Sequence, residues 1–333
     1  MKIKLLIASP DIDYVEHLSN VLSEKHSDTF DISVCSSTEH LSNMLNSNKF
    51  DVALIEPIFV STINADSVRL LLMLMDESSN TEDYSGAKRI RKYQRISSIA
   101  GNVLENYAEV STGVNSFDSS KARITAVWSP SGGSGKTTVA LAFAANSVLS
   151  GKSVVYLNLE CFSSTSVYFK NSGRSISKAF EKLESNVHLF LAGIRQQDSS
   201  SGISYFCEPE NYDDMNILSK EDIETIVGAC ATGVDELIVD LSSQCDERVQ
   251  KIFEIANTVL LVCESSGTSQ IKLKQFLSQH NVFGQINSKV VLVNNKGAKT
   301  TDASISKVIH LPLLQSNDPV STYKTLSGGN FDW

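Results

Sequence analysis

The sequence predicts an α/β protein of two domains, each built on a mostly parallel sheet with helices on both faces. Short apolar runs alternate with stretches whose apolar residues recur at the 3–4 residue spacing of a helix, a pattern typical of strands joined by crossover helices. The chain has 333 residues, more than the usual domain of roughly 100–200. Apolar residues make up 41% and charged residues 20% of it, which favours a packed core over a disordered chain.

We place the first domain at residues 1–110 and the second at 121–333. Residues 111–120 between them are polar and show no periodicity, so we interpret them as a linker. In the first domain, apolar runs predict strands and 3–4 spacing predicts helices. The strand runs are Ile3–Ala8, Phe30–Val34, Val52–Ile55 and Leu70–Met75, and the helical stretches are Asp11–Leu22 and Leu41–Leu45.

The second domain repeats this alternation. Its strand runs are Ile124–Trp128, Val154–Leu159, Leu237–Val239, Val259–Cys263 and Val290–Val293. A capping-box pattern, Ser219-Lys-Glu-Asp222, opens one of the helices between them. Because ligands bind at the carboxyl ends of strands in such sheets, we expect the chemistry of this domain directly after these runs.

Composition excludes several classes of function. The net charge is -9, and an acidic surface repels phosphate backbones, so we expect no nucleic-acid partner. No apolar run approaches the roughly 20 residues of a membrane span, and the first residues do not look like a signal peptide. The six cysteines form no C-x-x-C pair, which favours buried free thiols in a reducing cytoplasm. We therefore expect a cytoplasmic protein without direct membrane insertion.

A glycine-rich segment follows the run Ile124–Trp128 and precedes a helix rich in Ala, Leu and Val. It reads Ser129-Pro-Ser-Gly-Gly-Ser-Gly-Lys-Thr-Thr138. Glycines let backbone amides wrap around phosphate oxygens at the positive end of a helix dipole. The segment therefore predicts a phosphate-binding loop rather than a simple turn, with Lys136 on the β- and γ-phosphates and Thr137 as a ligand of Mg²⁺. The candidate cofactor-binding residues are Gly132, Gly133, Ser134, Gly135, Lys136, Thr137 and Thr138.

The double glycine in this loop resembles the deviant loop of the ParA and MinD family of partitioning and septum-placing ATPases. The resemblance extends over most of residues 122–333 and implies ATP and Mg²⁺ as cofactors and a homodimer as the assembly. In that family a signature lysine precedes the two glycines and reaches the partner's nucleotide; here the position holds Ser131. This difference predicts slow or absent hydrolysis.

Later segments resemble further landmarks of the same family. Glu236-Leu-Ile-Val-Asp240 is similar to the Walker B strand, which implies that Asp240 holds Mg²⁺ through a water. Glu160 stands where the family has the aspartate that positions the attacking water, and a longer side chain there predicts impaired turnover. Either Asn294 or Asn295 would recognise adenine, and Pro312 and Leu313 would line the base.

Residues 1–106 resemble a response-regulator receiver domain, whose fold is flavodoxin-like. In that fold an aspartate after the third strand accepts the phosphoryl group, an acidic pair after the first strand holds Mg²⁺ and a lysine follows the fifth strand. Glu56 occupies the acceptor position, Asp11 alone remains near the acidic pair, and Lys92 matches the lysine. We therefore expect a degenerate receiver that cannot be phosphorylated and serves in docking or dimerisation. The alternative is a sheet that only stabilises its neighbour.

An atypical receiver joined to a deviant ParA-like ATPase resembles the TadZ/CpaE family, which acts in assembly of the tight-adherence (Flp) pilus. The resemblance implies an ATP-binding hub at a cell pole, with other pilus-assembly proteins as partners. One alternative is an active ParA or MinD-type ATPase that cycles on membrane or DNA. A further alternative, a signalling regulator with a phosphorylatable input, is disfavoured by Glu56.

Overall fold

The computed structural model describes residues 2–27, 29–64, 66–76, 87–110, 122–183, 187–316, 318–331 and 333. The predicted linker at 111–120 lies outside these residues. The chain divides into two compact units, one of residues 1–118 with 184–193 and one of residues 119–183 with 194–333. Each unit contains one sheet, so the α/β fold class predicted from the sequence is confirmed.

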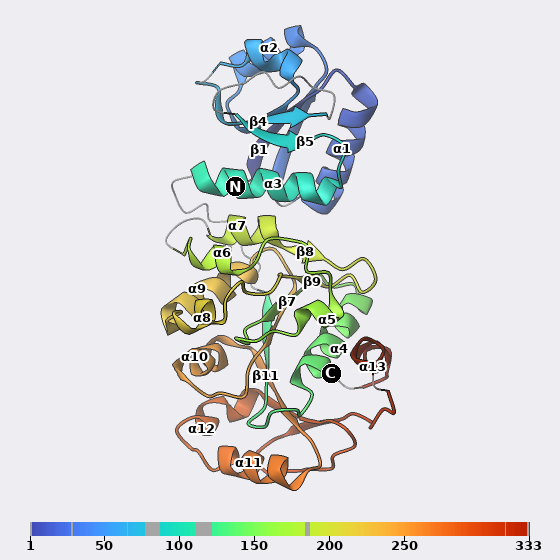
Figure 1. The fold of residues 1–333 in the computed structure, drawn as a ribbon, viewed down its shortest axis with the longest axis vertical. Helices are drawn as coiled ribbons and strands as arrows, with labels where there is room; N and C mark the ends of the chain where they lie inside the picture. The colour runs from blue at the N-terminus through green and yellow to red at the C-terminus, as the bar shows by residue number, and fades with distance from the viewer. Residues whose placement is uncertain are drawn as a thin grey trace. The chain divides into compact units, whose positions relative to one another are not determined.

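The first unit is built on a five-stranded sheet in the order β2-β1-β3-β4-β5, and all its pairs are parallel. This is the order of the flavodoxin-like fold. Helices α1 and α3 pack on one face of the sheet, and α2 and η1 on the other (Figure 1). The elements are β1 Ile3–Ala8, α1 Ile12–Lys25, β2 Phe30–Cys35, α2 Thr38–Ser47, β3 Phe50–Ile55, η1 Pro57–Thr62, β4 Val68–Met75, β5 Lys88–Arg91 and α3 Ile96–Val110.

One further helix belongs to this unit although it comes much later in the sequence. Helix α7, Val187–Ile194, contributes its residues up to Gly193. Gly101 of α3 and Gly193 face each other so closely that a Cβ on either residue would lie against the backbone carbonyl of the other. The small size of both residues therefore sets the distance between these two helices.

The second unit is built on an eight-stranded sheet in the order β13-β12-β11-β6-β10-β7-β9-β8. Only the β8–β9 pair at one edge is antiparallel. The strands are β6 Arg123–Trp128, β7 Val154–Asn158, β8 Gln196–Gln197, β9 Ser204–Tyr205, β10 Glu236–Asp240, β11 Thr258–Cys263, β12 Val290–Asn294 and β13 Lys307–His310. The five predicted strand runs are all confirmed, whereas the short β8, β9 and β13 were not predicted.

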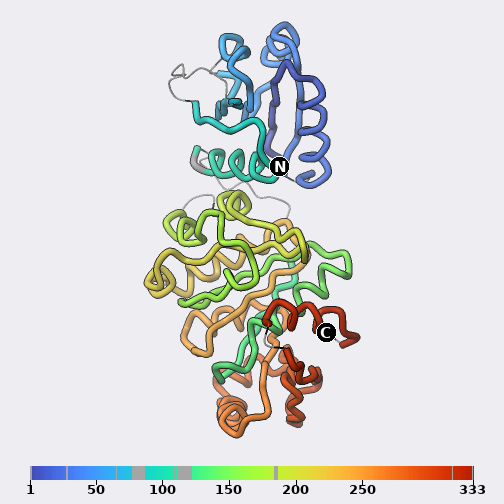
Figure 2. The backbone as a smooth tube through the Cα atoms, turned by 45° about the vertical axis from the view of Figure 1, so that its right-hand side comes forward, coloured from blue at the N-terminus to red at the C-terminus, as the bar shows by residue number. Residues whose placement is uncertain are grey.

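The helices of the second unit lie on both faces of this sheet. Helices α4 and α13 pack together on one face, and α9 and α10 on the other (Figures 1 and 2). The capping box predicted at Ser219 is present at the start of α9. The helices are α4 Lys136–Leu149, α5 Thr165–Tyr168, α6 Ser177–Phe180, α8 Tyr212–Asn216, α9 Lys220–Cys230, α10 Glu247–Ile255, α11 Gly267–Leu277, α12 Phe283–Ile286, η2 Asn287–Lys289 and α13 Pro319–Ser327.

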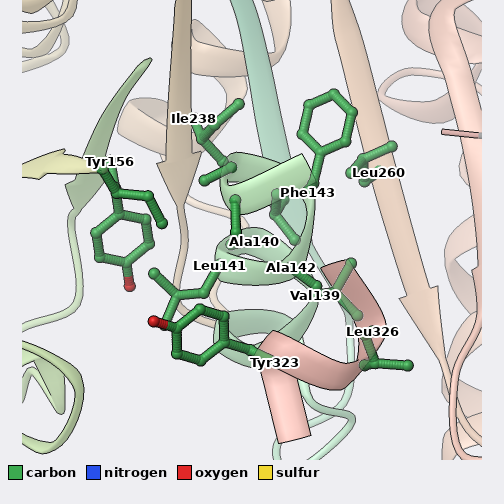
Figure 3. Close-up of a cluster of buried hydrophobic side chains, with 14 of the residues drawn as sticks. Val139, Ala140, Leu141, Ala142, Phe143, Tyr156, Ile238, Leu260, Tyr323 and Leu326 are labelled. Carbon is green, nitrogen blue, oxygen red and sulfur yellow. The ribbon is translucent and has the colours of Figure 1, made fainter. Parts of the chain in front are cut away.

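Helix α4 is apolar on nearly every side, which is typical of a helix enclosed in a core. Val139 to Ala145 are all buried between the sheet and α13, where Tyr323 and Leu326 cover them (Figure 3). Alanines at every second position from Ala140 to Ala144 let the helix approach its neighbours closely. The loop before α4 is therefore anchored to a rigid element.

The prediction of six buried, free cysteines is correct for only part of the set. All six cysteines are free, as predicted, but only Cys35, Cys207, Cys230 and Cys263 are buried. Cys161 is half-buried and Cys245 exposed because each follows a strand at the sheet's carboxyl edge, where the chain turns into loops. Among the described residues, we find no helix with the length and apolar character that a bilayer span requires.

Candidate functional site

The glycine-rich segment forms a tight loop between β6 and α4. Gly133 and Gly135 have φ angles of 74° and 91°, a left-handed conformation that side chains rarely adopt. A Cβ on Gly135 would also run into the side-chain amide of Asn295. Gly133 and Gly135 have positive φ angles, and Ser134 between them does not. A backbone that alternates in this way turns its N–H groups to one side and its carbonyls to the other, which produces an anion-binding concavity. The loop thus has the backbone that phosphate binding needs.

The strand order places this loop at the centre of the carboxyl edge of the sheet. Strand β6 lies between β11 and β10, and the chain leaves it toward β7 on one side. Such a switch point is where open α/β sheets bind ligands. The residues after β6, β7, β10, β11 and β12 therefore converge here, as the sequence predicted.

Lys136, the first residue of α4, is almost fully buried within this edge. Its Nζ donates to the Ser243 hydroxyl at 3.1 Å and lies 4.0 Å from Oε1 of Glu160. Burial raises the pKa of Glu160, while the Lys136 charge and a hydrogen bond with Asn158 oppose that rise. The structure thus brings two predicted residues, Lys136 and Glu160, to one place. Ser243 was not predicted, because nothing in its local sequence marks it.

Asp240 ends β10 and is completely buried. Burial, followed by the charge of Glu160, raises the pKa of this carboxyl to about 7, against hydrogen bonds from Thr137 and Tyr156. The Tyr156 hydroxyl donates to Oδ2 at 2.8 Å, and Nδ2 of Asn158 lies 3.3 Å from the same oxygen. Tyr156 was missed, although it lies two residues before Asn158 and so faces the same side of β7.

Two buried polar atoms beside the loop have no hydrogen-bond partner. They are Oδ1 of Asp240 and Oγ of Ser134. Buried polar atoms are nearly always paired, so an orphaned carboxylate oxygen next to a phosphate-type loop indicates room for a cation or its water. Thr137, whose hydroxyl lowers the pKa of Asp240, supplies a second oxygen. These residues fit a hydrated Mg²⁺ beside bound phosphates.

The two asparagines at the end of β12 have different surroundings. The Asn294 amide bonds within the protein: Nδ2 donates to Thr300 O at 2.7 Å, and Oδ1 accepts from Thr300 N at 3.0 Å. Asn295 instead points at the phosphate loop, where its Nδ2 donates to Ser134 O at 2.9 Å. The sequence did not distinguish Asn294 from Asn295. In the structure, only Asn295 contacts the phosphate loop.

Pro312 and Leu313 lie in the loop after β13, and both are exposed. This loop adjoins the one after β12, because Gly297 N donates to Leu311 O at 3.1 Å. Trp128 is the last residue of β6, directly before the glycine-rich loop. Its indole Nε1 donates to Gln244 O at 2.8 Å, and its ring meets Phe253 edge-on.

The predicted degenerate receiver site is also assembled, at the carboxyl edge of the first sheet. Lys92 Nζ lies 2.8 Å from Oε1 of Glu56 and 3.6 Å from Oδ2 of Asp11. The Ser9 hydroxyl donates to the same Glu56 oxygen. Burial alone would lower the pKa of Lys92, but the hydrogen bond and charge of Glu56 raise it. Glu56 is therefore paired with the Lys92 ammonium and accepts a hydrogen bond from Ser9.

These geometries can be set against known proteins. Residues 1–108 match the family model of the TadZ-like receiver domain. The first unit is therefore similar in sequence to TadZ-like receiver domains, and its strand order is that of the flavodoxin-like fold. A comparison with curated protein sequences found no match.

Solved structures similar to this chain include three of the ParA and MinD type. A ParA family ATPase from Chlorobium tepidum is 20% identical, with a TM-score of 0.49 over 62% of this chain and 90% of the other. The septum site-determining protein MinD from Pyrococcus horikoshii, complexed with Mg-ADP, is 11% identical, with a TM-score of 0.46 over 62% and 94%. A plasmid partition protein from Borrelia burgdorferi bound to AMPPNP is 12% identical, with a TM-score of 0.44 over 62% and 96%.

Proposed function

We propose that this protein is an ATP-binding localisation and assembly factor of a tight-adherence (Flp) type pilus. It dimerises through residues 121–333 and acts as a hub at a cell pole or at the inner face of the membrane, reached through other pilus-assembly proteins. Two findings support the proposal: the match of residues 1–108 to the TadZ-like receiver domain, and the loop geometry after β6. The observation that carries the nucleotide assignment is the orphaned Oδ1 of buried Asp240 beside that loop.

We assign the nucleotide contacts as follows. The amides of the loop bind the phosphates, Lys136 binds the β- and γ-phosphates, and Asn295 recognises adenine with its Oδ1. Asn295 is preferred over Asn294 because the Asn294 amide already bonds to Thr300. Bound Mg²⁺ would offset phosphate charge. The full set is Gly132, Gly133, Ser134, Gly135, Lys136, Thr137 and Thr138 for phosphate, Thr137 and Asp240 for Mg²⁺, and Asn295, Pro312 and Leu313 for the base.

Slow or absent turnover is part of the proposal. Ser131 brings no positive charge to the loop, and its backbone N–H is bonded to the Ser129 hydroxyl at 3.2 Å. Glu160, the candidate for positioning water, is held 4.0 Å from Lys136 Nζ. A carboxylate that faces the lysine needed by the phosphates must move before it can orient a water. ATP then acts mainly as a structural ligand, which stabilises the state that binds it by mass action.

A second candidate is an active ParA or MinD-type ATPase that positions machinery on a membrane or on DNA. One observation favours it: Glu160 is mostly buried and its pKa is raised, as in a general base. Turnover separates the two candidates. A steady-state rate near the enzyme median of about 10 per second would favour the second.

The test is calorimetric titration of MgATP into the full chain and into Lys136→Ala. We expect micromolar binding by the wild type and at least a hundredfold weaker binding by the variant, because a buried cation aimed at the phosphates is lost. Unchanged circular dichroism is the control for folding. Light scattering with and without ATP measures dimerisation. Equal ATP affinity of the two proteins would contradict the loop assignment, and a monomer at saturating ATP would contradict the assembly.

A further inference from the structure

The loop after β12 contains a strained residue. Lys296 has a φ of 51°, and among the described residues it is the only non-glycine with a positive φ. L-amino acids with a side chain rarely adopt this conformation, and it persists where other contacts impose it. An asparagine side chain can stabilise this conformation through a hydrogen bond to the nearby backbone, but a lysine side chain is too long to do so. The contacts of its side chain therefore need an explanation.

Those contacts join Lys296 to the phosphate loop. Its Nζ donates to Gly133 O at 2.6 Å and lies 3.3 Å from Oε2 of Glu264, which follows β11. The neighbouring Asn295 donates to the next carbonyl, Ser134 O, at 2.9 Å. The loop after β12 therefore donates hydrogen bonds to two consecutive carbonyls of the phosphate loop. Glu264 fixes the ammonium group that makes one of these bonds.

Each carbonyl belongs to a peptide group whose N–H lies on the opposite side. The peptide that begins with Gly133 C=O carries the N–H of Ser134, and the next carries the N–H of Gly135. A charge-assisted hydrogen bond is roughly twice as strong as a neutral one. Bonds in a chain also polarise one another, so a cation on the carbonyl makes the N–H a stronger donor. Lys296 can thus strengthen phosphate binding without touching the phosphate.

We propose that Lys296 is a positioning residue of the nucleotide site, which holds and polarises the Gly133–Ser134 peptide for a nucleoside polyphosphate. This inference rests on the proposed function, since it concerns the same loop. The segment from Ser129 to Thr138 contains a single cation, Lys136. Lys296 supplies a second cation from the loop after β12 of the same subunit. Its action is directed at the phosphates and is indifferent to the base.

The chain offers a matched control for this proposal. Lys299 lies three residues further along the same loop, and it is exposed like Lys296. Lys296→Met and Lys299→Met remove the same charge and keep an unbranched side chain. Lys296→Arg keeps a charged donor of similar reach. We expect Lys296→Met to weaken MgATP and MgADP binding about tenfold, as suits a charged hydrogen bond that is partly exposed. Lys299→Met should match the wild type, and Lys296→Arg should recover most of the affinity.

Inorganic triphosphate gives a measurement that a merely structural role would not change. If Lys296 acts on the phosphate loop, Lys296→Met weakens inorganic triphosphate by the same factor as ATP and leaves the ratio of ATP to GTP affinity unchanged. Equal melting temperatures of the nucleotide-free proteins are expected. Wild-type affinity in Lys296→Met, or a loss confined to the ATP-to-GTP ratio, would overturn the inference. Absence of nucleotide binding by the wild type would overturn the proposed function as well.

Discussion

Two carboxylates occupy matching places in the two units, each after a parallel strand at the carboxyl edge of a sheet, and their surroundings are opposite. Glu56 of the receiver unit meets an internal cation, with Lys92 Nζ at 2.8 Å and the Ser9 hydroxyl on the same oxygen. Asp240 of the second unit is fully buried, has an unpartnered oxygen and a pKa raised to about 7. Glu56 thus has a counter-ion within its own unit, whereas one oxygen of Asp240 has no partner.

This difference bears on what each unit can do. At the receiver site the two carboxylates, Glu56 and Asp11, both lie against Lys92. In the second unit, the buried Asp240 has an oxygen without a hydrogen-bond partner, which costs free energy in the absence of a ligand. The comparison predicts that neutralising Asp240 stabilises the nucleotide-free protein, whereas removing the charge of Lys92 destabilises it.

The largest effect is expected at Asp240. The folded protein holds the Asp240 proton up to about pH 7, whereas an unfolded aspartate releases it near pH 3.9, its ordinary pKa being about that value. The free energy of unfolding of the nucleotide-free protein should therefore fall as the pH rises from about 4 to about 7, by at most about 4 kcal/mol. Asp240→Asn should flatten this slope in urea titrations at pH 5 and pH 8. An unchanged slope would show that Asp240 is ionised throughout.

A smaller effect is expected at Lys92. Lys92→Met leaves Glu56 without its cation in a mostly buried site, which should destabilise the full chain by about 3 kcal/mol. Adding Glu56→Gln should recover a large part of the loss, because the unpaired charge is gone. Urea unfolding of the two single variants and the double variant gives the coupling energy. Strictly additive losses would mean that the two side chains do not form a working ion pair.

A phosphoryl donor is expected to have no effect on the receiver unit. Acetyl phosphate with Mg²⁺ should leave the mass of the intact protein unchanged. Glu56→Asp alone should not restore labelling, since Ser9 and Pro10 replace the acidic pair. A mass increase of one phosphoryl group that disappears in Glu56→Gln would contradict our description of the receiver site.

Periodicity and spacing were enough to predict the core of both units. The strands that form the centre of each sheet are continuous apolar runs, and the phosphate loop is marked by glycines at fixed positions. Edge elements were not predicted, because β8 and β9 have two residues each and β13 has four, too few for a periodic signal. The capping box at Ser219 was predictable because it depends on residues three apart.

The site was predictable only where one short segment contains the signal. Lys136 and Thr137 belong to such a segment. Ser243, Tyr156 and the bond from Lys296 to Gly133 depend on strands brought together by the sheet, so no local pattern reveals them. Asn294 and Asn295 are adjacent and chemically identical. They differ because Asn294 is the last residue of β12 and Asn295 is the first residue after it, and successive side chains of an extended chain point to opposite sides.

The position of Trp128 gives the molecule an optical reporter of its own. The indole ends the strand that leads into the phosphate loop, and its N–H is bonded to Gln244 O in the segment after Asp240. Any rearrangement of that segment changes the hydrogen bond of the fluorophore and its contact with Phe253. The emission of this buried indole will therefore shift when the segment moves, and in a Trp333→Phe variant an unlabelled sample is enough to follow the kinetics of that movement.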